Sequence, residues 1–439
     1  MTAEIAIMNK EAVALAADSA VTITGAPEQK IFSSANKLFT LSKYHPIGIM
    51  VHGQATFMQI PWEAIIKIYR HRLGKKSFET IREQATHFIS FLENDQLLFP
   101  ESIQSEYIRN SIYAYFGYLR NAIREGLEKK IRDQGQITEK QVKEIVSKTI
   151  KRHYDKWDKV KNIESLPSSF NEDIIAKHET TILDAIKKFF EKLPISDNDV
   201  ELLKKNASYL FSRFIEEIIH PEASGLVIAG FGEKETFPSL LSYDLEMKVN
   251  NKLKYRTILE EKIKFDMTAT IVPFAQREMV HVFMEGVDSS YLEVEESYLT
   301  RMCNEYLKII VDNLDRYNGT EKNDLRKRLI PLTKKLIRDR HKTLEVYRRK
   351  KFVDPVIRAV SILPKDELAA MAEALVNLTS FKRKVTMERE TVGGPIDVAL
   401  ISKGDGFIWI KRKHYFENEE NSQFFSNYFR EVENEEVKD

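Results

Sequence analysis

The sequence predicts an α+β protein in which antiparallel sheets are elaborated by added helical regions. Strand patterns cluster at the two ends of the chain and once near its middle, and the stretches between them have helical periodicity. With 439 residues, of which 43% are hydrophobic, the chain is long enough for roughly two to four domains and a sizeable core.

The first expected element is a hairpin at the N-terminus. Ile5 and Ile7 alternate with small or polar residues, residues 9–11 can turn, and Val13 and Leu15 resume the alternation. The N-terminal residues are therefore expected to lie in a sheet.

Two amphipathic helices are expected next, over residues 57–72 and 77–92, where they would cover one face of a sheet. Residues 95–221 continue the helical pattern and are highly charged. Two apolar stripes run through that region, formed by Ile182, Ile186, Phe189, Phe190 and Leu193, and by Leu202, Leu203, Leu210, Phe211, Phe214 and Ile218.

The middle strands are expected over residues 225–232 and 238–244. A further helical region covers residues 294–384, with interruptions expected near Pro331, Pro355 and Pro364. Its last helix, over 366–381, is predicted to bury Leu368, Met371, Leu375 and Leu378. The final strands, 395–401 and 407–411, flank a turn at 403–406 and form a hairpin.

Composition excludes several classes of protein. No run of eighteen apolar residues is present, so no membrane span is expected. The N-terminus has no secretory pattern, which predicts a cytoplasmic protein. A single cysteine, Cys303, excludes an intramolecular disulfide framework and a Cys-rich metal site. The net charge of +1 is uninformative about partners.

Thr2 and Asp18 are the best indication of chemistry. Because Met1 precedes a small residue, its removal is expected, and Thr2 would then carry a hydroxyl and a free α-amine. An α-amine titrates near roughly 7.7 to 8.0, so it can act as the base that activates the hydroxyl. A nearby lysine cation would lower the pKa of that amine, and an aspartate would hold the lysine in place. Lys37 and Asp18 are the candidates.

Four segments carry a family resemblance: residues 2–7, 13–19, 37–39 and 49–53. Together they resemble the opening of proteasome β subunits and of the bacterial HslV peptidase, which are N-terminal-nucleophile (Ntn) hydrolases. The residues that match are Thr2, Asp18, Lys37 and Gly53.

The resemblance implies a threonine-type endopeptidase in which Thr2 attacks a scissile carbonyl and the Gly53 N–H stabilises the oxyanion. It also implies a four-layer α/β/β/α sandwich of antiparallel sheets and assembly into a homo-oligomeric ring. The expected segments are an Ntn core over 1–94, 223–293 and 385–416, a helical insertion over 95–222, a helical region over 294–384, and an acidic tail over 417–439.

The chain departs from the family pattern before the last hairpin. Active members carry an aspartate, two further residues and Ser-Gly-Gly there, and a direct match puts Arg389 and Val392 at the aspartate and serine positions. A shifted match lets Glu390 or Glu388, together with Thr391, substitute for them. Supporting roles are predicted for Ser19, Glu390, Thr391 and Gly393.

The family's Gly-Ser-Gly segment is also missing. The corresponding stretch, 269–276, ends in Gln276, which either donates hydrogen bonds near the site or caps the helix that follows.

Other chemistries have weak support. The ten histidines form no pair at the helical spacing of a metal site, so no metal is expected. Residues 230–232 lack the third glycine of a dinucleotide fingerprint, and residues 74–77 lack the first glycine of a Walker loop. No cofactor is therefore expected, and a separate ATPase would supply any energy.

A rival interpretation starts from charge. Residues 326–351 hold twelve Lys or Arg against two acidic residues, with further basic clusters at 382–384 and 411–413. The favoured reading is a solvated face that pairs with acidic neighbours, so nucleic acid is not expected as a partner. The alternative function is a catalytically silent Ntn-fold scaffold or nucleic-acid-binding subunit of an oligomeric assembly.

Overall fold

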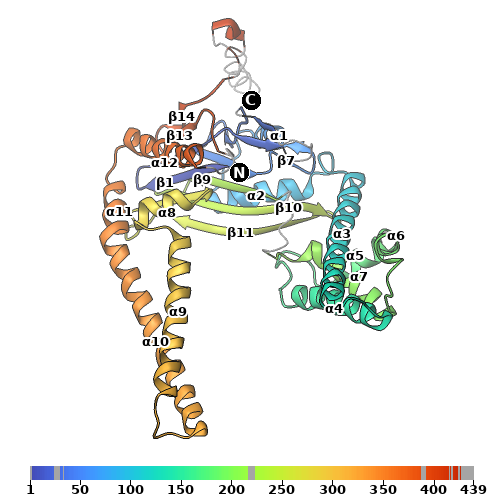
Figure 1. Ribbon diagram of the computed structural model, residues 1–439. Coiled ribbons are helices and arrows are strands. Elements are labelled where there is room, and N and C mark those ends of the chain that lie inside the picture. Colours follow the sequence, from blue (N-terminus) through green and yellow to red (C-terminus); the bar gives the residue numbers. More distant parts are fainter. Residues whose placement is uncertain are drawn as a thin grey trace. The chain divides into compact units, whose positions relative to one another are not determined.

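The protein is described as a computed structural model that covers residues 2–23, 30–32, 34–215, 223–386, 392–414, 416, 419–423 and 426. It is an α+β protein with antiparallel strand pairing, as predicted (Figure 1). Its contacts divide the chain into two compact units. Unit 1 holds Met1–His52, Ala229–Ser239 and Glu261–Asp439, and unit 2 holds Gly53–Ile228 and Leu240–Glu260.

The first sheet lies in unit 1 and has the strand order β12-β1-β2-β13-β14. Its strands are β1 (Ala3–Asn9), β2 (Ala12–Ala17), β12 (Ala269–Ala275), β13 (Asp397–Ser402) and β14 (Gly406–Lys411). Each neighbouring pair is antiparallel. The predicted N-terminal and C-terminal hairpins are thereby confirmed, and β2 pairs with β13 to join them into one sheet.

Strand β12 was not predicted, because Pro273 interrupts its strand pattern. Proline cannot donate to a ladder and is therefore found on edge strands. β12 is such an edge strand, because it lies at one end of the strand order.

The second sheet has the strand order β11-β10-β9-β6-β5. Its strands are β5 (Leu38–Thr40), β6 (Ile47–Gly53), β9 (Ser224–Gly230), β10 (Ser239–Val249) and β11 (Lys252–Lys262). Within unit 1, β6 packs closely on the first sheet: a Cβ at Gly48 would lie 2.8 Å from Ile401 and 2.9 Å from Leu15. A larger residue at this position would displace the ends of both side chains.

Two small two-stranded sheets complete the strands. They are formed by β3 (Val21–Ile23) with β4 (Lys30–Phe32), and by β7 (Thr56–Phe57) with β8 (Ile60–Pro61).

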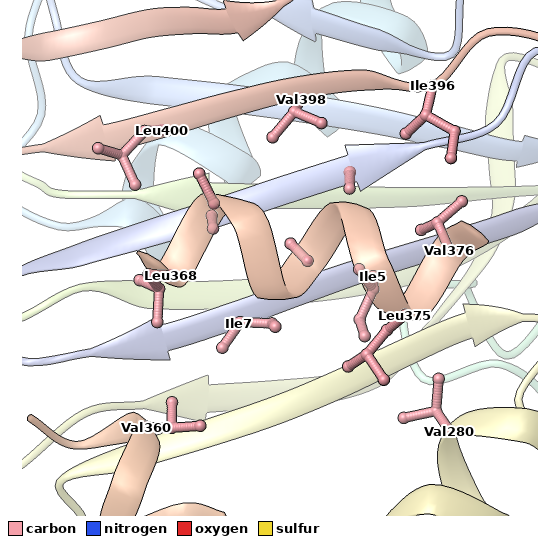
Figure 2. Packing of buried hydrophobic residues seen from close by; sticks show 14 of the residues in the cluster. Ile5, Ile7, Val280, Val360, Leu368, Leu375, Val376, Ile396, Val398 and Leu400 are labelled. Carbon is pink, nitrogen blue, oxygen red and sulfur yellow. The ribbon is translucent and has the colours of Figure 1, made fainter. Parts of the chain in front are cut away.

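Helix α12 (Lys365–Val385) lies across β1 and β2 and buries the core of unit 1 (Figure 2). Leu368 and Leu375 of α12 pack with Ile5 and Ile7 of β1. Leu378 was also predicted to be buried, but it is 38% exposed, because it lies outside the apolar stripe that faces the sheet. Helices α8 (Glu278–Glu285) and α11 (Asp354–Val360) border the same cluster.

Two long helices, α9 (Ser289–Asp312) and α10 (Gly319–Arg348), form a hairpin in unit 1 (Figure 1). The interruption predicted at Pro331 is wrong, because α10 runs through it. A proline removes only one N–H donor, and this exposed helix keeps its other bonds. The break comes at a π-helical turn, Arg349–Val353, ahead of α11.

Unit 2 contains seven of the described helices. They are α1 (Trp62–Leu73), α2 (Ile81–Asn94), α3 (Glu101–Gln134), α4 (Glu139–Asp158), α5 (Phe170–Lys177), α6 (Glu179–Phe190) and α7 (Asp197–Ser212). Capping boxes at Thr138 and Ser196 fix the starts of α4 and α7.

Candidate active site

The β1–β2 hairpin brings Asp18 beside the start of β1. The Asn9 side chain accepts from the N–H groups of Glu11 and Ala12, which closes the turn. The register then pairs Glu4 with Ala17. Asp18, the next residue, donates its N–H to the Ala3 carbonyl at 3.1 Å.

The Asp18 carboxylate is fully buried and accepts four hydrogen bonds. Oδ1 accepts from the Ala3 N–H at 3.1 Å and from Lys37 Nζ at 2.6 Å. Oδ2 accepts from the N–H groups of Ala20 at 3.3 Å and Gly393 at 2.9 Å. A carboxylate has about four lone-pair sites, so this environment satisfies the ionised form.

Lys37 joins Asp18 to Thr2. It precedes β5, and its carbonyl accepts from the Val51 N–H at 2.8 Å, which ties its backbone to β6. Its Nζ donates to Thr2 Oγ1 at 3.0 Å. Thr2 is only 3% exposed, and its carbonyl accepts from the Gln276 N–H at 3.1 Å. Three of the four matched residues therefore meet in unit 1.

Opposing effects act on the pKa of Lys37 in this cluster. Burial lowers the pKa of the Lys37 ammonium, while the charge and hydrogen bond of Asp18 favour its protonated form. Glu4 also favours that form, and the Lys413 cation disfavours it. The Lys37 ammonium, held by Asp18, is therefore positioned to donate a hydrogen bond to the Thr2 oxygen.

Sequence reasoning missed Glu4, which is the most unusual residue of the cluster. Ile5 and Ile7 face the core under α12, so by alternation Thr2 and Glu4 lie on the other face of β1. Burial raises the pKa of Glu4 to about 8, although Lys37 acts in the opposite direction. Among the residues that the structure describes, neither carboxyl oxygen has a hydrogen-bond partner. A lone acidic residue within an apolar strand was the available signal.

A second buried pair, Asp397 with Lys413, was also missed. Asp397 pairs with Ala17 across β2 and β13, and its carboxylate accepts from both the backbone N–H and the Nζ of Lys413. Both side chains are buried. Lys413 belongs to the basic cluster at 411–413, and its pairing with Asp397 agrees with the favoured interpretation that these clusters pair with acidic neighbours.

The predicted supporting residues have different outcomes. Ser19 donates its N–H to Gly393 at 3.1 Å and its hydroxyl to Pro395 at 2.5 Å, so it ties the site to the segment before β13. Gly393 contacts Asp18 as described above. Gln276 accepts a hydrogen bond from Arg383 and binds the Thr2 backbone through its own N–H. Glu388, Arg389, Glu390 and Thr391 lie outside the described residues.

Gly53 ends β6 and is the first residue of unit 2. Its φ of +83° and a Cβ position 2.6 Å from the Ala223 carbonyl oxygen both require glycine. Its role as the oxyanion donor to Thr2 stays a prediction.

The described ranges hold neither a metal-binding cluster nor a membrane-spanning helix. No group of three or more His, Cys, Asp or Glu side chains is arranged there to hold a metal ion. None of the described helices combines the length and apolar character required to span a bilayer.

No family model and no curated protein sequence matches this chain. The solved structure of an Anbu (Gly-1) mutant from Hyphomicrobium sp. strain MC1 is similar to it at 9% identity with a TM-score of 0.28. The comparison covers 98% of this chain and 96% of the other. A likeness at this level carries no argument about function.

Proposed function

We propose that this chain is a threonine-type peptidase or amidohydrolase of the Ntn class, with Thr2 as the nucleophile. The observation that carries the proposal is the contact of Lys37 Nζ with both Thr2 Oγ1, at 3.0 Å, and Asp18, at 2.6 Å. In this proposal the two packed sheets and their helices belong to a four-layer α/β/β/α sandwich.

The mechanism begins with excision of Met1, which converts the Thr2 nitrogen from a peptide nitrogen into an amine. That amine accepts the hydroxyl proton as the Thr2 oxygen attacks the scissile carbonyl. The scissile C–N bond then breaks, the leaving amine takes the proton back from the Thr2 ammonium, and the acyl group stays on Thr2 as an ester. Lys37 stabilises the developing negative charge on the oxygen and keeps the amine partly neutral by like-charge repulsion. The Gly53 N–H is assigned to the oxyanion, and water then releases the acyl group.

The first experiment measures the intact mass of the purified protein to test removal of Met1. The protein is then incubated with a peptide boronate or vinyl sulfone, and adducts are located by mass spectrometry. We expect labelling of Thr2, retention in Thr2→Ser, and loss in Thr2→Ala. Thr86→Ala, at an exposed position of α2, is the matched control.

Lys37→Met tests the cation. We expect labelling to slow by roughly 10²-fold or more, as when a donor that stabilises developing negative charge is removed. Lys10→Met, at a half-exposed lysine, should label normally. A mature protein that keeps Met1 and takes no label at Thr2 would contradict the proposal.

One observation favours the catalytically silent alternative. Val392, at the position where a direct match places the family's serine, is 1% exposed and packs in the α12 core. The silent scaffold then predicts that Thr2→Ala leaves every property of the protein unchanged. The labelling experiment separates the two functions.

A further inference from the structure

The α9–α10 hairpin is held together by a well-defined seam. Arg340 pairs with Glu295 and Arg326 pairs with Asp312, so the helices are antiparallel. The half-buried and buried residues mark the rest of the seam: Leu292, Leu299, Cys303, Leu307 and Val311 of α9, and Lys322, Leu329, Thr333 and Ile337 of α10.

The residues that precede each seam position form a second surface. One residue is about 100° of rotation in an α-helix, and in an antiparallel pair the preceding residues of both helices turn to the same side. We call this side the hairpin face. Its large apolar members are Tyr291, Val294, Tyr298, Met302, Tyr306, Ile310, Leu332 and Leu336, and all are exposed.

The opposite side of the hairpin is polar. The residues that follow each seam position include four basic residues, Lys308, Lys327, Lys334 and Arg338, and three acidic residues, Glu293, Glu296 and Asp312. This balance is typical of a solvated surface, and it lacks the excess positive charge that binds nucleic acid or anionic lipid. The hairpin face, which is apolar and exposed, is therefore the better candidate for a protein interface.

The size of the hairpin face fits a protein partner. Its eight large side chains are between 43% and 70% exposed, and together they offer on the order of 800 Å². That is the area each partner buries in a standard protein–protein interface. Tyrosine and methionine, which such interfaces favour, supply four of the eight residues.

Two charges on the hairpin face indicate what the partner is. Arg328 and Asp339 of α10 are exposed and flank Leu332 and Leu336. Within the described part of the chain, the structure gives neither side chain an ion pair. Eleven residues separate them, or roughly 16 Å along the helix, so they do not pair with each other. A twofold axis between Leu332 and Leu336 would bring Arg328 of one copy to Asp339 of another.

We propose that the hairpin face docks onto the same face of a second copy of this chain, with the two α10 helices antiparallel and Arg328 opposite Asp339 of the other copy. The contact is isologous, so each copy contributes the same surface. It produces a four-helix bundle from two hairpins. This proposal does not depend on the activity of Thr2.

The test is a charge exchange in the full chain, followed by sedimentation velocity over a range of protein concentrations. Arg328→Asp and Asp339→Arg should each weaken self-association at least tenfold, because each places like charges together across the twofold axis. The double variant should restore association, since the exchanged charges attract again. Arg338→Asp, on the polar side of α10, is the matched control and should associate normally.

Folding is checked by circular dichroism, and exposed positions were chosen because they tolerate charge. Restoration in the double variant supports the proposal, since no contact within one chain accounts for it. A monomeric native chain, or single variants that associate normally, would overturn it. Binding to phosphatidylglycerol vesicles that is lost in Leu332→Glu, with a monomeric native chain, would assign the face to lipid instead.

Discussion

At the residue scale, three side chains define the chemistry of the candidate site. Thr2, Asp18 and Lys37 were chosen from sequence, and they lie in hydrogen-bonding contact. They were found from the N-terminal position of Thr2 and from the resemblance of the surrounding segments to Ntn hydrolases. Glu4 and the Asp397–Lys413 pair were not found, since a charge inside a strand reveals neither its burial nor its partner.

Removing the anion beside Lys37 should damage both stability and reactivity. Asp18→Asn leaves a buried ammonium without its counter-charge, and breaking a buried pair costs roughly 3 to 5 kcal/mol. We expect a corresponding loss in the unfolding free energy from urea titration, and loss of Thr2 labelling. Asp405→Asn breaks the exposed pair with Lys365 and should cost much less, because solvent screens that pair. Equal losses in the two variants would contradict this account.

Glu4 should make the fold less stable at alkaline pH. Its pKa of about 8 in the folded state lies above its ordinary value of 4.5, so the folded state binds the proton more tightly. Its stabilising contribution is complete below pH 4.5 and is lost as the pH rises through 8. Between these values the unfolding free energy of the native chain should fall by up to about 1.4 kcal/mol per pH unit relative to Glu4→Gln.

Urea titrations of the two proteins at several pH values check the Glu4 prediction. Lys37 has a lowered pKa and acts in the opposite direction at alkaline pH, but it is present in both proteins. Parallel stability curves for the native chain and Glu4→Gln would show that Glu4 is ionised throughout.

At the scale of elements, alternation and helical periodicity located most strands and helices. The failures have local causes: Pro273 obscured β12, the charged sequence of β11 hid a long strand, and Pro331 suggested a break that α10 does not have. An edge strand and an exposed helix both tolerate a residue that central positions exclude. The formation of these three elements therefore depended on where each lies in a sheet or on the surface.

Helix α12 offers a direct test of which positions build the core. Leu368→Ala removes a fully buried side chain from the cluster under α12 and should cost roughly 2 to 5 kcal/mol of unfolding free energy. Leu378→Ala, on the same helix at a position that is 38% exposed, should cost much less. Urea unfolding measures both free energies. A larger loss of unfolding free energy from Leu378→Ala would show that α12 buries a different face.

At the scale of the whole molecule, access to Thr2 should limit the substrates. Thr2 is 3% exposed, and a folded protein cannot bring a scissile bond to a buried oxygen. If the proposed peptidase is active, we expect hydrolysis of short fluorogenic peptides but no digestion of a stably folded protein. Parallel assays of the two substrates provide the measurement. Comparable rates for both would show that the nucleophile is openly accessible.

The sequence by itself determined the strand and helix patterns, the α+β class and the choice of Thr2, Asp18 and Lys37 as candidate site residues. These features depend on local periodicity and on the ends of strands, which are written in consecutive residues. Only the tertiary structure decided that Glu4 and Lys413 are buried, that α12 turns Leu378 outward, and that α9 and α10 share one apolar face. Burial and charge pairing arise from contacts between segments distant in the chain, and no local pattern encodes them.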